Sequence, residues 1–505
     1  MDLSRTKFAR RQGLILLLCV LTAAVFIGLC SRSSPLYPFN DWDDNNCFFT
    51  VGKSMLHGRV VYRDIYEQKG VLLYFLYGLA YLVSHTSFAG VYLLETLSFS
   101  AFLYLAYRTA RLFVSRLPAC LMLPCLAAVV CSSYSFFLGG SVEQLCLPLI
   151  YLPLYCFLQT AERGEGPLPG KGTVIGLGFA AGCVLWMKYT LLGIYVGYVL
   201  FIAVYLLSRR EFAALFRAAG QFLLGVLAAS APWLLYFAVN GALKDLFTVY
   251  FYNNIFLYTE MEESRLALAM ANLKAGILWN SRTSLAIALG FLAALLSKRD
   301  WAFKAGLFSL YASCTAFVFI SGVAYDYYAL ALAALAVPGF VFLAWAAQKG
   351  AEKLFRRDWP KRRALASVLL YAAILMLGGV FAYRHSVNSF YMAYDREDMW
   401  YTRFAETIKA SEDKSLLNYG FMDLGLYTLT DLVPETRYFC TLNITLPEMY
   451  EAMDEALRER RTAFVLAVSA DEPLLTENYE LIDSAESIYQ FEEVPMTYYL
   501  FQRKA

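Results

Sequence analysis

Charged residues are scarce in this chain of 505 residues. Asp, Glu, Lys and Arg make up 17% of it, against about 25% in soluble proteins. Apolar residues make up 59%, above the usual range of about 45–50%. This balance excludes a disordered or fibrous protein, argues against a purely soluble enzyme and predicts a membrane protein with several spans. Three histidines, far apart in the sequence, give no sign of a His-rich metal site.

Short motifs of several enzyme classes are also missing. The sequence has no GxGxxG, Walker A, HExxH or GxSxG pattern. Its 11 cysteines form no CxxC pair and suggest no disulfide framework, because most lie in apolar runs where Cys packs as a small hydrophobic residue. Only Cys47 and Cys440 stand in clearly polar surroundings. Basic residues are dispersed, which gives no support to a nucleic-acid partner.

Long apolar runs are the main feature that is present. The first, Gly13–Cys30, follows four basic residues and lacks a small-x-small cleavage site, so we expect a retained span with a cytoplasmic N-terminus. Ten more runs bring the expected number of spans to eleven. They cover residues 88–107, 118–136, 144–160, 173–187, 191–208, 222–240, 283–297, 305–323, 329–347 and 364–382.

The apolar segment 71–84 decides the expected topology. Its 14 residues would reach about 21 Å as a helix, short of a hydrocarbon core of roughly 30 Å. If it does not cross, 22 Lys/Arg of residues 1–383 fall in cytoplasmic segments and 10 fall outside. Because cytoplasmic loops are the basic ones, we expect 71–84 to stay in the outer leaflet and the C-terminus to lie outside.

The C-terminal part differs in charge from the rest. Residues 384–505 carry 22 acidic and 11 basic side chains, whereas residues 1–383 carry 19 acidic and 32 basic ones. Apolar and turn patterns predict strands at 414–420 and 462–468 and a helix at 446–461 with a proline near its start. We therefore predict an α-helical polytopic membrane domain, 1–383, followed by a small extracytoplasmic α/β domain, 384–505.

The first external loop, about 31–87, is unusually charged. One interpretation is an ordinary solvated loop. Against it, the carboxylates are interspersed with aromatic residues, as at a membrane interface, and Lys69 directly precedes the apolar segment, at the depth where a cation can hold a lipid phosphate. The charged residues are Asp41, Asp43, Asp44, Lys53, His57, Arg59, Arg63, Asp64, Glu67 and Lys69.

This loop resembles that of the GT-C glycosyltransferases, the group that includes bacterial aminoarabinose transferases and protein O-mannosyltransferases. The likeness rests on an early acidic residue, the segment "MLHG" 11 residues after Asp44, and "YRD…EQKG" before an amphipathic run. The resemblance implies a multi-span enzyme that uses a sugar linked to a lipid phosphate. It implies that Asp44 acts near the sugar and acceptor, that Lys69 grips the phosphate, and that Glu143 is the second-loop acid. Gln68 separates Glu67 from Lys69, which departs from the family's Glu-Lys element.

The chemistry of transfer from a sugar phosphate requires the same groups. A sugar phosphate carries its own leaving group, so the protein must supply a carboxylate base for the acceptor and a cation for the departing phosphate. Asp44 fits the first role and Lys69 the second, with Arg63 and Arg59 as auxiliary cations. Asp43 is the neighbouring alternative to Asp44. No cofactor is expected, and the need for a metal is left open.

Three further acids and one lysine complete the candidate site. Glu95 lies inside an apolar run, where an acid is costly, and is either functional or a buried hydrogen-bonded group. Lys188 stands at the external end of the fifth run, as a second phosphate ligand or as an interface anchor. We assign Asp64, Glu67 and Glu95 to substrate binding.

The expected function is transfer of a sugar from a polyprenyl-phosphate donor to a cell-envelope acceptor at the outer face of the plasma membrane. The partners are then the donor, the acceptor and the lipid bilayer. A transporter or flippase of a lipid-linked glycan is the alternative. Transporters usually place ionisable groups on broken helices near the midplane, often within inverted repeats. The charged cluster here lies in a loop and no repeat is evident, which favours the enzyme.

Overall fold

The structure is a computed structural model, and it describes residues 3–164, 166–257, 264–320, 325–354, 363–444, 446–488 and 495–504. The chain forms two compact units. We call the first the helical unit; it comprises Met1–Ser31, Leu94–Ala231 and Met261–Ser389. We call the second the mixed unit; it comprises Arg32–Leu93, Pro232–Glu260 and Phe390–Ala505. Each is described by itself.

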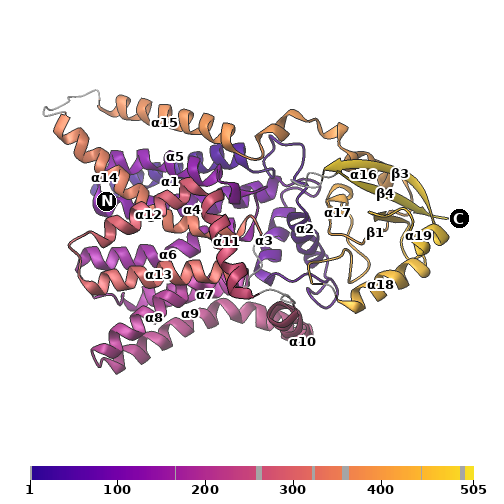
Figure 1. Cartoon of the computed structure of the whole chain (residues 1–505), viewed down its shortest axis with the longest axis horizontal. Coiled ribbons are helices and arrows are strands. Elements are labelled where there is room, and N and C mark those ends of the chain that lie inside the picture. Colours follow the sequence, from indigo (N-terminus) through magenta and orange to yellow (C-terminus); the bar gives the residue numbers. More distant parts are fainter. Residues whose placement is uncertain are drawn as a thin grey trace. The chain divides into compact units, whose positions relative to one another are not determined.

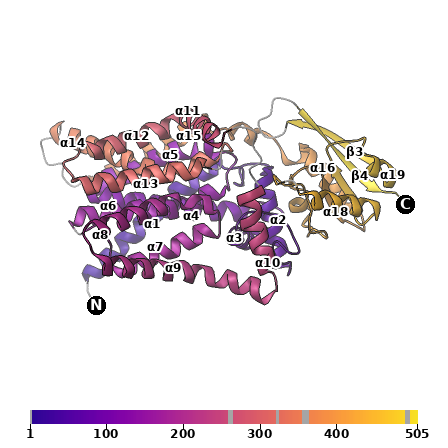
Figure 2. The same cartoon turned by 60° about the horizontal axis from the view of Figure 1, so that its bottom comes forward.

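Long apolar helices build the helical unit and run side by side in both views (Figures 1 and 2). Small residues let some of them approach closely: a Cβ added at Gly339 of α14 would lie 1.9 Å from the backbone oxygen of Ala286 in α12. The long helices are α1 (Leu3–Cys30), α4 (Ala89–Phe113), α5 (Arg116–Cys131), α6 (Val142–Arg163), α7 (Lys171–Leu185), α8 (Gly193–Ser208), α9 (Phe212–Val239), α11 (Arg265–Trp279), α12 (Ser281–Leu295), α13 (Trp301–Phe319), α14 (Val337–Leu354) and α15 (Arg363–His385). Short 3₁₀ segments are η1 (Tyr134–Phe136), η2 (Tyr189–Leu192) and η4 (Tyr328–Ala336).

Within the described ranges, eight helices are long and apolar enough to cross a membrane, and a ninth span results if the bent pair α11 and α12 counts as one. These two helices meet at 98°. Helices α5 and α7 are apolar but shorter, with 16 and 15 residues. Each of the eleven expected runs thus coincides largely with helix, which confirms a polytopic helical protein. The number eleven itself, and the orientation in the membrane, stay predictions.

The segment expected to stay out of the membrane core forms α3 (Val71–Tyr81), which has 11 residues. At 1.5 Å per residue it reaches roughly 16 Å, about half of the hydrocarbon thickness. Between the expected runs, residues 258–263 and 355–362 lie outside the described ranges, as do residues 321–323 of the expected run 305–323.

A four-stranded sheet forms in the C-terminal part of the mixed unit, in the order β1-β2-β4-β3. The pair β1/β2 is parallel, with Leu416 opposite Phe464, and the pairs of β4 with β2 and β3 are antiparallel. Both expected strands and the expected helix, which begins at Pro447, are confirmed. Figure 1 shows this sheet with its helices. The elements are η5 (Ser389–Ala393), η6 (Arg396–Asp398), α16 (Trp400–Ala410), β1 (Leu416–Tyr419), α17 (Leu426–Thr430), α18 (Pro447–Arg458), β2 (Phe464–Ala467), α19 (Pro473–Asn478), β3 (Tyr479–Ile488) and β4 (Pro495–Arg503).

The remaining elements of the mixed unit come from the loop segments. Helix α2 (Asp43–Leu56) packs against α3, and its first 12 residues are buried. Residues 243–257 form α10 (Leu243–Asp245) and the π-helix η3 (Leu246–Leu257). Contacts therefore group the charged loop with the C-terminal region in one compact unit. The boundary between two folding domains that we expect at residue 383 stays a prediction.

Candidate active site

The first acidic residues stand at the beginning of α2. Asp43 turns its Oδ1 back to accept a hydrogen bond from the backbone N–H of Asp44, at 2.6 Å. A helix N-terminus favours negative charge because its first N–H groups point outward. Asp43 and Asp44 are both buried, with exposed fractions of 7% and 4%. The charged loop is therefore a packed part of the mixed unit, and the solvated-loop interpretation does not hold for these acids.

Lys69 faces the first turns of α2. Its Nζ lies 4.0 Å from Asp44 Oδ1 and 5.8 Å from the centre of the Phe48 ring. Residues four apart on a helix share one face, so Asp44 and Phe48 present a carboxylate and a ring to the same ammonium group. The structure thus brings together Asp44 and Lys69, the base and the cation that the sequence predicts.

The backbone of Lys69 is held from two sides. Glu67 Oε2 accepts hydrogen bonds from the Lys69 N–H, at 2.8 Å, and from the Tyr74 hydroxyl. On the other side, the Tyr62 hydroxyl donates to the Lys69 carbonyl at 2.5 Å. Burial raises the pKa of the Glu67 carboxyl, and the charge of Lys69 opposes that rise. Glu67 thus fixes the turn before α3, and its assignment to substrate binding stays a prediction.

Sequence reasoning missed the roles of Tyr62 and Tyr74. By sequence, Tyr62 is one of several aromatic residues in the charged loop, yet it holds the Lys69 backbone and stacks on Phe237, with ring centres 5.4 Å apart. Its backbone has a φ of 70°, unusual for a residue with a side chain. The spacing of the two tyrosines, seven residues before Lys69 and five residues after it, carries no periodic signal that could have singled them out.

Arg63 and Asp64 pair with each other. Arg63 Nε lies 2.7 Å from Asp64 Oδ1, and its Nη1 donates to the carbonyl of Asn240 at 2.5 Å. Asp64 Oδ2 accepts from the N–H of Val60 and so closes a tight turn. The hydrogen bond from Arg63 lowers the pKa of the Asp64 carboxyl. These contacts describe a partly exposed, structural pair, and the predicted roles of Arg63 in phosphate binding and of Asp64 in substrate binding are not tested by them.

Glu143 and Lys188 meet within the helical unit. Glu143 is the second residue of α6, and Lys188 lies in the break between α7 and η2. Lys188 Nζ is 2.5 Å from Glu143 Oε1 and 3.4 Å from the centre of the Tyr328 ring. Both residues are buried, and Glu143 Oε2 has no hydrogen-bond partner among the described residues. The tight pairing joins two residues whose roles were predicted separately.

Glu95 is buried in α4 and bonded locally. Both of its oxygens accept from the hydroxyl of Ser31, at 2.9 and 2.8 Å. Gly139 packs against the same group: a Cβ there would lie 2.0 Å from Ser31 Oγ and 2.9 Å from Glu95 Oε1. This environment matches the alternative of a buried, hydrogen-bonded acid. The assignment of Glu95 to substrate binding remains a prediction.

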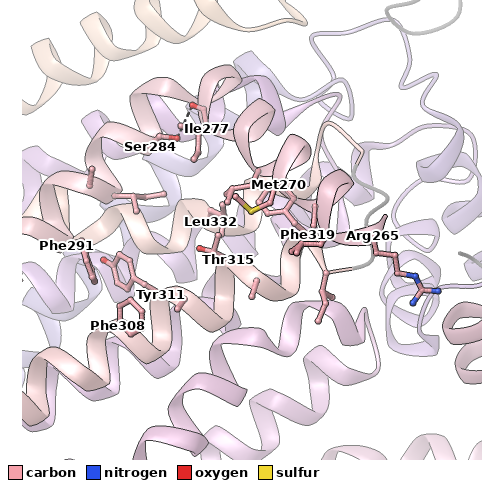
Figure 3. Close-up of a pocket in the computed structure, with 18 residues that line it drawn as sticks. Arg265, Met270, Ile277, Ser284, Phe291, Phe308, Tyr311, Thr315, Phe319 and Leu332 are labelled. Atoms are coloured by element: carbon pink, nitrogen blue, oxygen red, sulfur yellow. Dashed lines mark hydrogen bonds between the residues drawn. The ribbon is translucent and has the colours of Figure 1, made fainter. Parts of the chain in front are cut away.

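An apolar cavity of about 850 Å³ lies in the helical unit between α11, α12, α13 and η4. Figure 3 shows Phe291, Phe308 and Tyr311 toward one end and Arg265 at the other, with its guanidinium group directed away from the apolar side chains. Leu332 of η4 also lines it. Because η4 begins at Tyr328, the ring beneath Lys188, one short element connects the buried ion pair to this cavity.

No group of three or more His, Cys, Asp and Glu residues with metal-binding geometry occurs in the described ranges. We therefore name no metal ligands. The candidate chemistry rests on carboxylates, ammonium groups and hydroxyls.

No family model and no curated protein matches this chain. Solved structures do match it. ArnT from Cupriavidus metallidurans, bound to undecaprenyl phosphate, aligns with a TM-score of 0.62 and 13% identity over 96% of this chain and 98% of ArnT. The archaeal oligosaccharyltransferase AglB from Archaeoglobus fulgidus, in complex with an inhibitory peptide and a dolichol-phosphate, aligns with a TM-score of 0.55 and 13% identity over 93% of this chain and 70% of AglB. Both are membrane glycosyltransferases of the GT-C fold, and the fold that the sequence resemblance implied is confirmed.

Proposed function

We propose that this protein transfers a sugar from a polyprenyl-phosphate carrier to an acceptor of the cell envelope. The observation that carries the proposal is the buried pair of Asp44 and Lys69 within a chain that has the GT-C fold over almost its whole length. Support for a lipid-linked donor comes from the undecaprenyl phosphate and dolichol-phosphate in the two solved structures.

The reaction needs one base and one cation. The acceptor's hydroxyl or amine attacks the anomeric carbon while the bond from that carbon to the phosphate oxygen breaks. Asp44 takes the acceptor's proton, and the electron pair of the broken bond leaves with the phosphate. Lys69 stabilises the charge that grows on the phosphate, an effect that is strongest in a site shielded from water. Glu67, Tyr62 and Tyr74 position Lys69 through its backbone.

The apolar cavity fits the isoprenoid part of such a donor by its chemistry. Its lining is almost entirely aliphatic and aromatic, and it lies among helices of membrane-spanning character. We assign Lys188, beside Tyr328 at the start of η4, to the donor phosphate, with Glu143 as its partner. Glu143 is in turn the second acid that the family resemblance implies.

Orientation is part of the same proposal. We place the N-terminus in the cytoplasm and residues 384–505 outside, with α3 lying in the outer leaflet. The split of basic residues between the two sides, 22 against 10, supports this orientation. A C-terminal alkaline phosphatase fusion should be active and a C-terminal fluorescent protein dark. The reverse pattern would reject the orientation.

The transfer test is an assay of purified protein in proteoliposomes with a panel of polyprenyl-phosphate sugars and cell-envelope fractions. We expect free polyprenyl phosphate to accumulate together with a glycosylated acceptor. The matched control is Asp44→Asn, which keeps the shape of the side chain and removes the base. Movement of intact donor across the bilayer without release of polyprenyl phosphate would instead establish the transporter alternative.

A further inference from the structure

Two cysteines far apart in the sequence face each other in the mixed unit. Cys47 lies in α2, and Cys440 lies in the segment between α17 and α18. Their sulfur atoms are 3.7 Å apart, and both residues are buried. They are also the two cysteines that the sequence sets apart, because each stands in polar surroundings.

The surrounding contacts hold α2 against the C-terminal region in one register. The Thr50 hydroxyl donates to Asp423 Oδ2 at 2.8 Å, and Lys53 Nζ donates to the Tyr427 carbonyl at 2.7 Å. One turn earlier, the Thr428 hydroxyl donates to Asn46 Oδ1 at 3.1 Å. Asn46, Thr50 and Lys53 follow the i, i+4, i+7 spacing of one helix face, and Cys47 lies next to that face, so these contacts fix the helix turn that carries its thiol.

The backbone around Cys440 is fixed as well. The carbonyl of Phe439 accepts from the N–H of Asn418 in β1, at 3.2 Å, and the N–H of Thr441 donates to the carbonyl of Phe421, at 3.0 Å. Both neighbours of Cys440 are thus tied to β1 and to the turn that follows it. The two thiols therefore face each other because both α2 and the segment around Cys440 are held in place by hydrogen bonds.

We propose that Cys47 and Cys440 form a structural disulfide that joins the first external loop to the C-terminal region. The proposal rests on the outer location of residues 384–505 in the proposed function, because disulfides persist in oxidising compartments outside the cytoplasm. A disulfide bond is about 2.0 Å long, so the sulfur atoms, 3.7 Å apart, must approach by roughly 2 Å to form it.

The oxidation is a thiol–disulfide exchange with a disulfide-bonded oxidant of the compartment, either an oxidase or a small-molecule disulfide. One cysteine thiolate attacks the oxidant and forms a mixed disulfide, and the second cysteine displaces the oxidant's remaining sulfur. The protein loses two protons and two electrons, and the oxidant's disulfide becomes two thiols. Burial raises the pKa of both cysteine thiols in the closed unit, so the exchange belongs to folding, while the thiols are still accessible.

The bond has a consequence for the candidate active site. Cys47 follows Asp44 by three residues in α2, about one helical turn. A disulfide at Cys47 therefore fixes the turn that carries the proposed base. We expect loss of the bond to loosen this turn as well as to destabilise the mixed unit.

The decisive experiment reads the bond from peptides. Membranes that contain the full chain are denatured with N-ethylmaleimide to block free thiols and are then digested with trypsin without reduction. Trypsin releases Cys47 in the peptide of residues 33–53 and Cys440 in that of 438–458, and each peptide holds one cysteine. We expect a linked species lighter than the sum of the two peptides by two hydrogen atoms, which separates on reduction.

The C-terminal reporter fusions, read in intact cells, test the orientation in parallel. Both peptides carrying N-ethylmaleimide in a protein whose C-terminus is outside would overturn the disulfide and leave the proposed function standing. Alkylated peptides with a cytoplasmic C-terminus would overturn the disulfide and the proposed orientation together. The transfer assay reports on the proposed function separately.

A stability measurement provides a second test of the disulfide. It compares the effect of reduction on the natural protein and on a double variant, so it does not depend on how well the single cysteine variants fold. We expect reduction to lower the unfolding midpoint of the natural protein and to leave that of the Cys47→Ala/Cys440→Ala protein unchanged. Cys125→Ala is the control, because Cys125 lies exposed on α5, and it should keep the full effect of reduction. An equal effect of reductant on the natural protein and the double variant would contradict the proposal.

Discussion

Two buried lysine–carboxylate pairs, one in each unit, differ in how closely the charges are joined. Lys188 Nζ lies 2.5 Å from Glu143 Oε1, whereas Lys69 Nζ lies 4.0 Å from Asp44 Oδ1. Hydrogen bonds between nitrogen and oxygen are about 2.7–3.2 Å long. The pair in the helical unit is therefore a closed contact, and the pair in the mixed unit is an open one.

We expect the closed pair to matter most for stability and the open pair to matter most for the reaction. A closed, buried ion pair mainly compensates two charges that have left water, and removing one partner leaves the other charge uncompensated. An open pair joins its charges less strongly, so each is more easily met by another group, as the proposed roles of Asp44 and Lys69 require. Changes at Glu143 and Lys188 should act first on folding, and changes at Asp44 and Lys69 should act first on turnover and donor use.

The largest effect is expected at the base. If Asp44 deprotonates the acceptor, Asp44→Asn should lower turnover by roughly 10²–10⁴-fold, while donor binding persists. The measurement is the rate of polyprenyl phosphate release at saturating donor. Asp43→Asn is the matched control, because an amide oxygen can still accept from the N–H of Asp44, and it should stay near the natural rate. A dead Asp43→Asn beside an active Asp44→Asn would move the base by one residue.

The closed pair should dominate stability. Lys188→Met leaves Glu143 buried without its cation and should lower the unfolding free energy by about 3–5 kcal/mol. Adding Glu143→Gln should restore most of that loss, which a double-mutant cycle in detergent measures. If Lys188 also holds the donor, the stable double variant will still show a raised donor KM. Full stability of Lys188→Met alone would mean that the pair is not closed in solution.

A third buried lysine extends the comparison to pH. Burial lowers the pKa of Lys53 to about 8 from 10.5. The unfolded chain therefore binds more protons between pH 8 and 10.5, so the unfolding free energy rises with pH across this window. Below pH 8, the free-energy cost of burying the charged Lys53 is present in full. We expect the stability of the natural protein, relative to Lys53→Met, to increase by about 3 kcal/mol from pH 7.5 to pH 10.5. A pH-independent difference between the two would refute a charged, buried Lys53.

The smallest of the four effects is expected at the phosphate cation. Lys69→Ala removes a charge-assisted contact worth roughly 1.5–3 kcal/mol, which corresponds to a decrease of about 10- to 150-fold in kcat/KM for the donor. Acceptor KM should change little. Lys69→Arg keeps the charge and should recover part of the donor affinity. Equal losses for donor and acceptor would show that Lys69 supports the fold of the site and does not hold the phosphate.

Local patterns were sufficient for much of the fold. The eleven apolar runs coincide largely with helices, and Pro447 marks the start of α18 as its fixed φ predicts. Segment 71–84 was recognised as too short to span, and it forms an 11-residue helix. Strands β3 and β4 were not foreseen, because polar residues interrupt them and β3 lies largely exposed at the edge of the sheet.

The candidate site was predictable only where its residues are close in sequence. Lys69 was singled out by its place directly before the apolar segment and Asp44 by the family resemblance, and the structure brings the two together, although their roles stay predictions. The pairing of Glu143 with Lys188, 45 residues away, and the support of Lys69 by Tyr62 and Tyr74 depend on packing that no local pattern encodes.

The sequence by itself determined the membrane class, the apolar helices and the chemical types available to a site, since each depends on composition and on periodicity within a few turns. The tertiary structure decided which charges are buried and which groups meet. Burial of α2 turned a charged loop into a packed element, placed Cys47 against Cys440, and faced Asp44 with Lys69. These contacts join segments separated by up to 393 residues, and only the closure of the chain, not any local preference, brings such segments together.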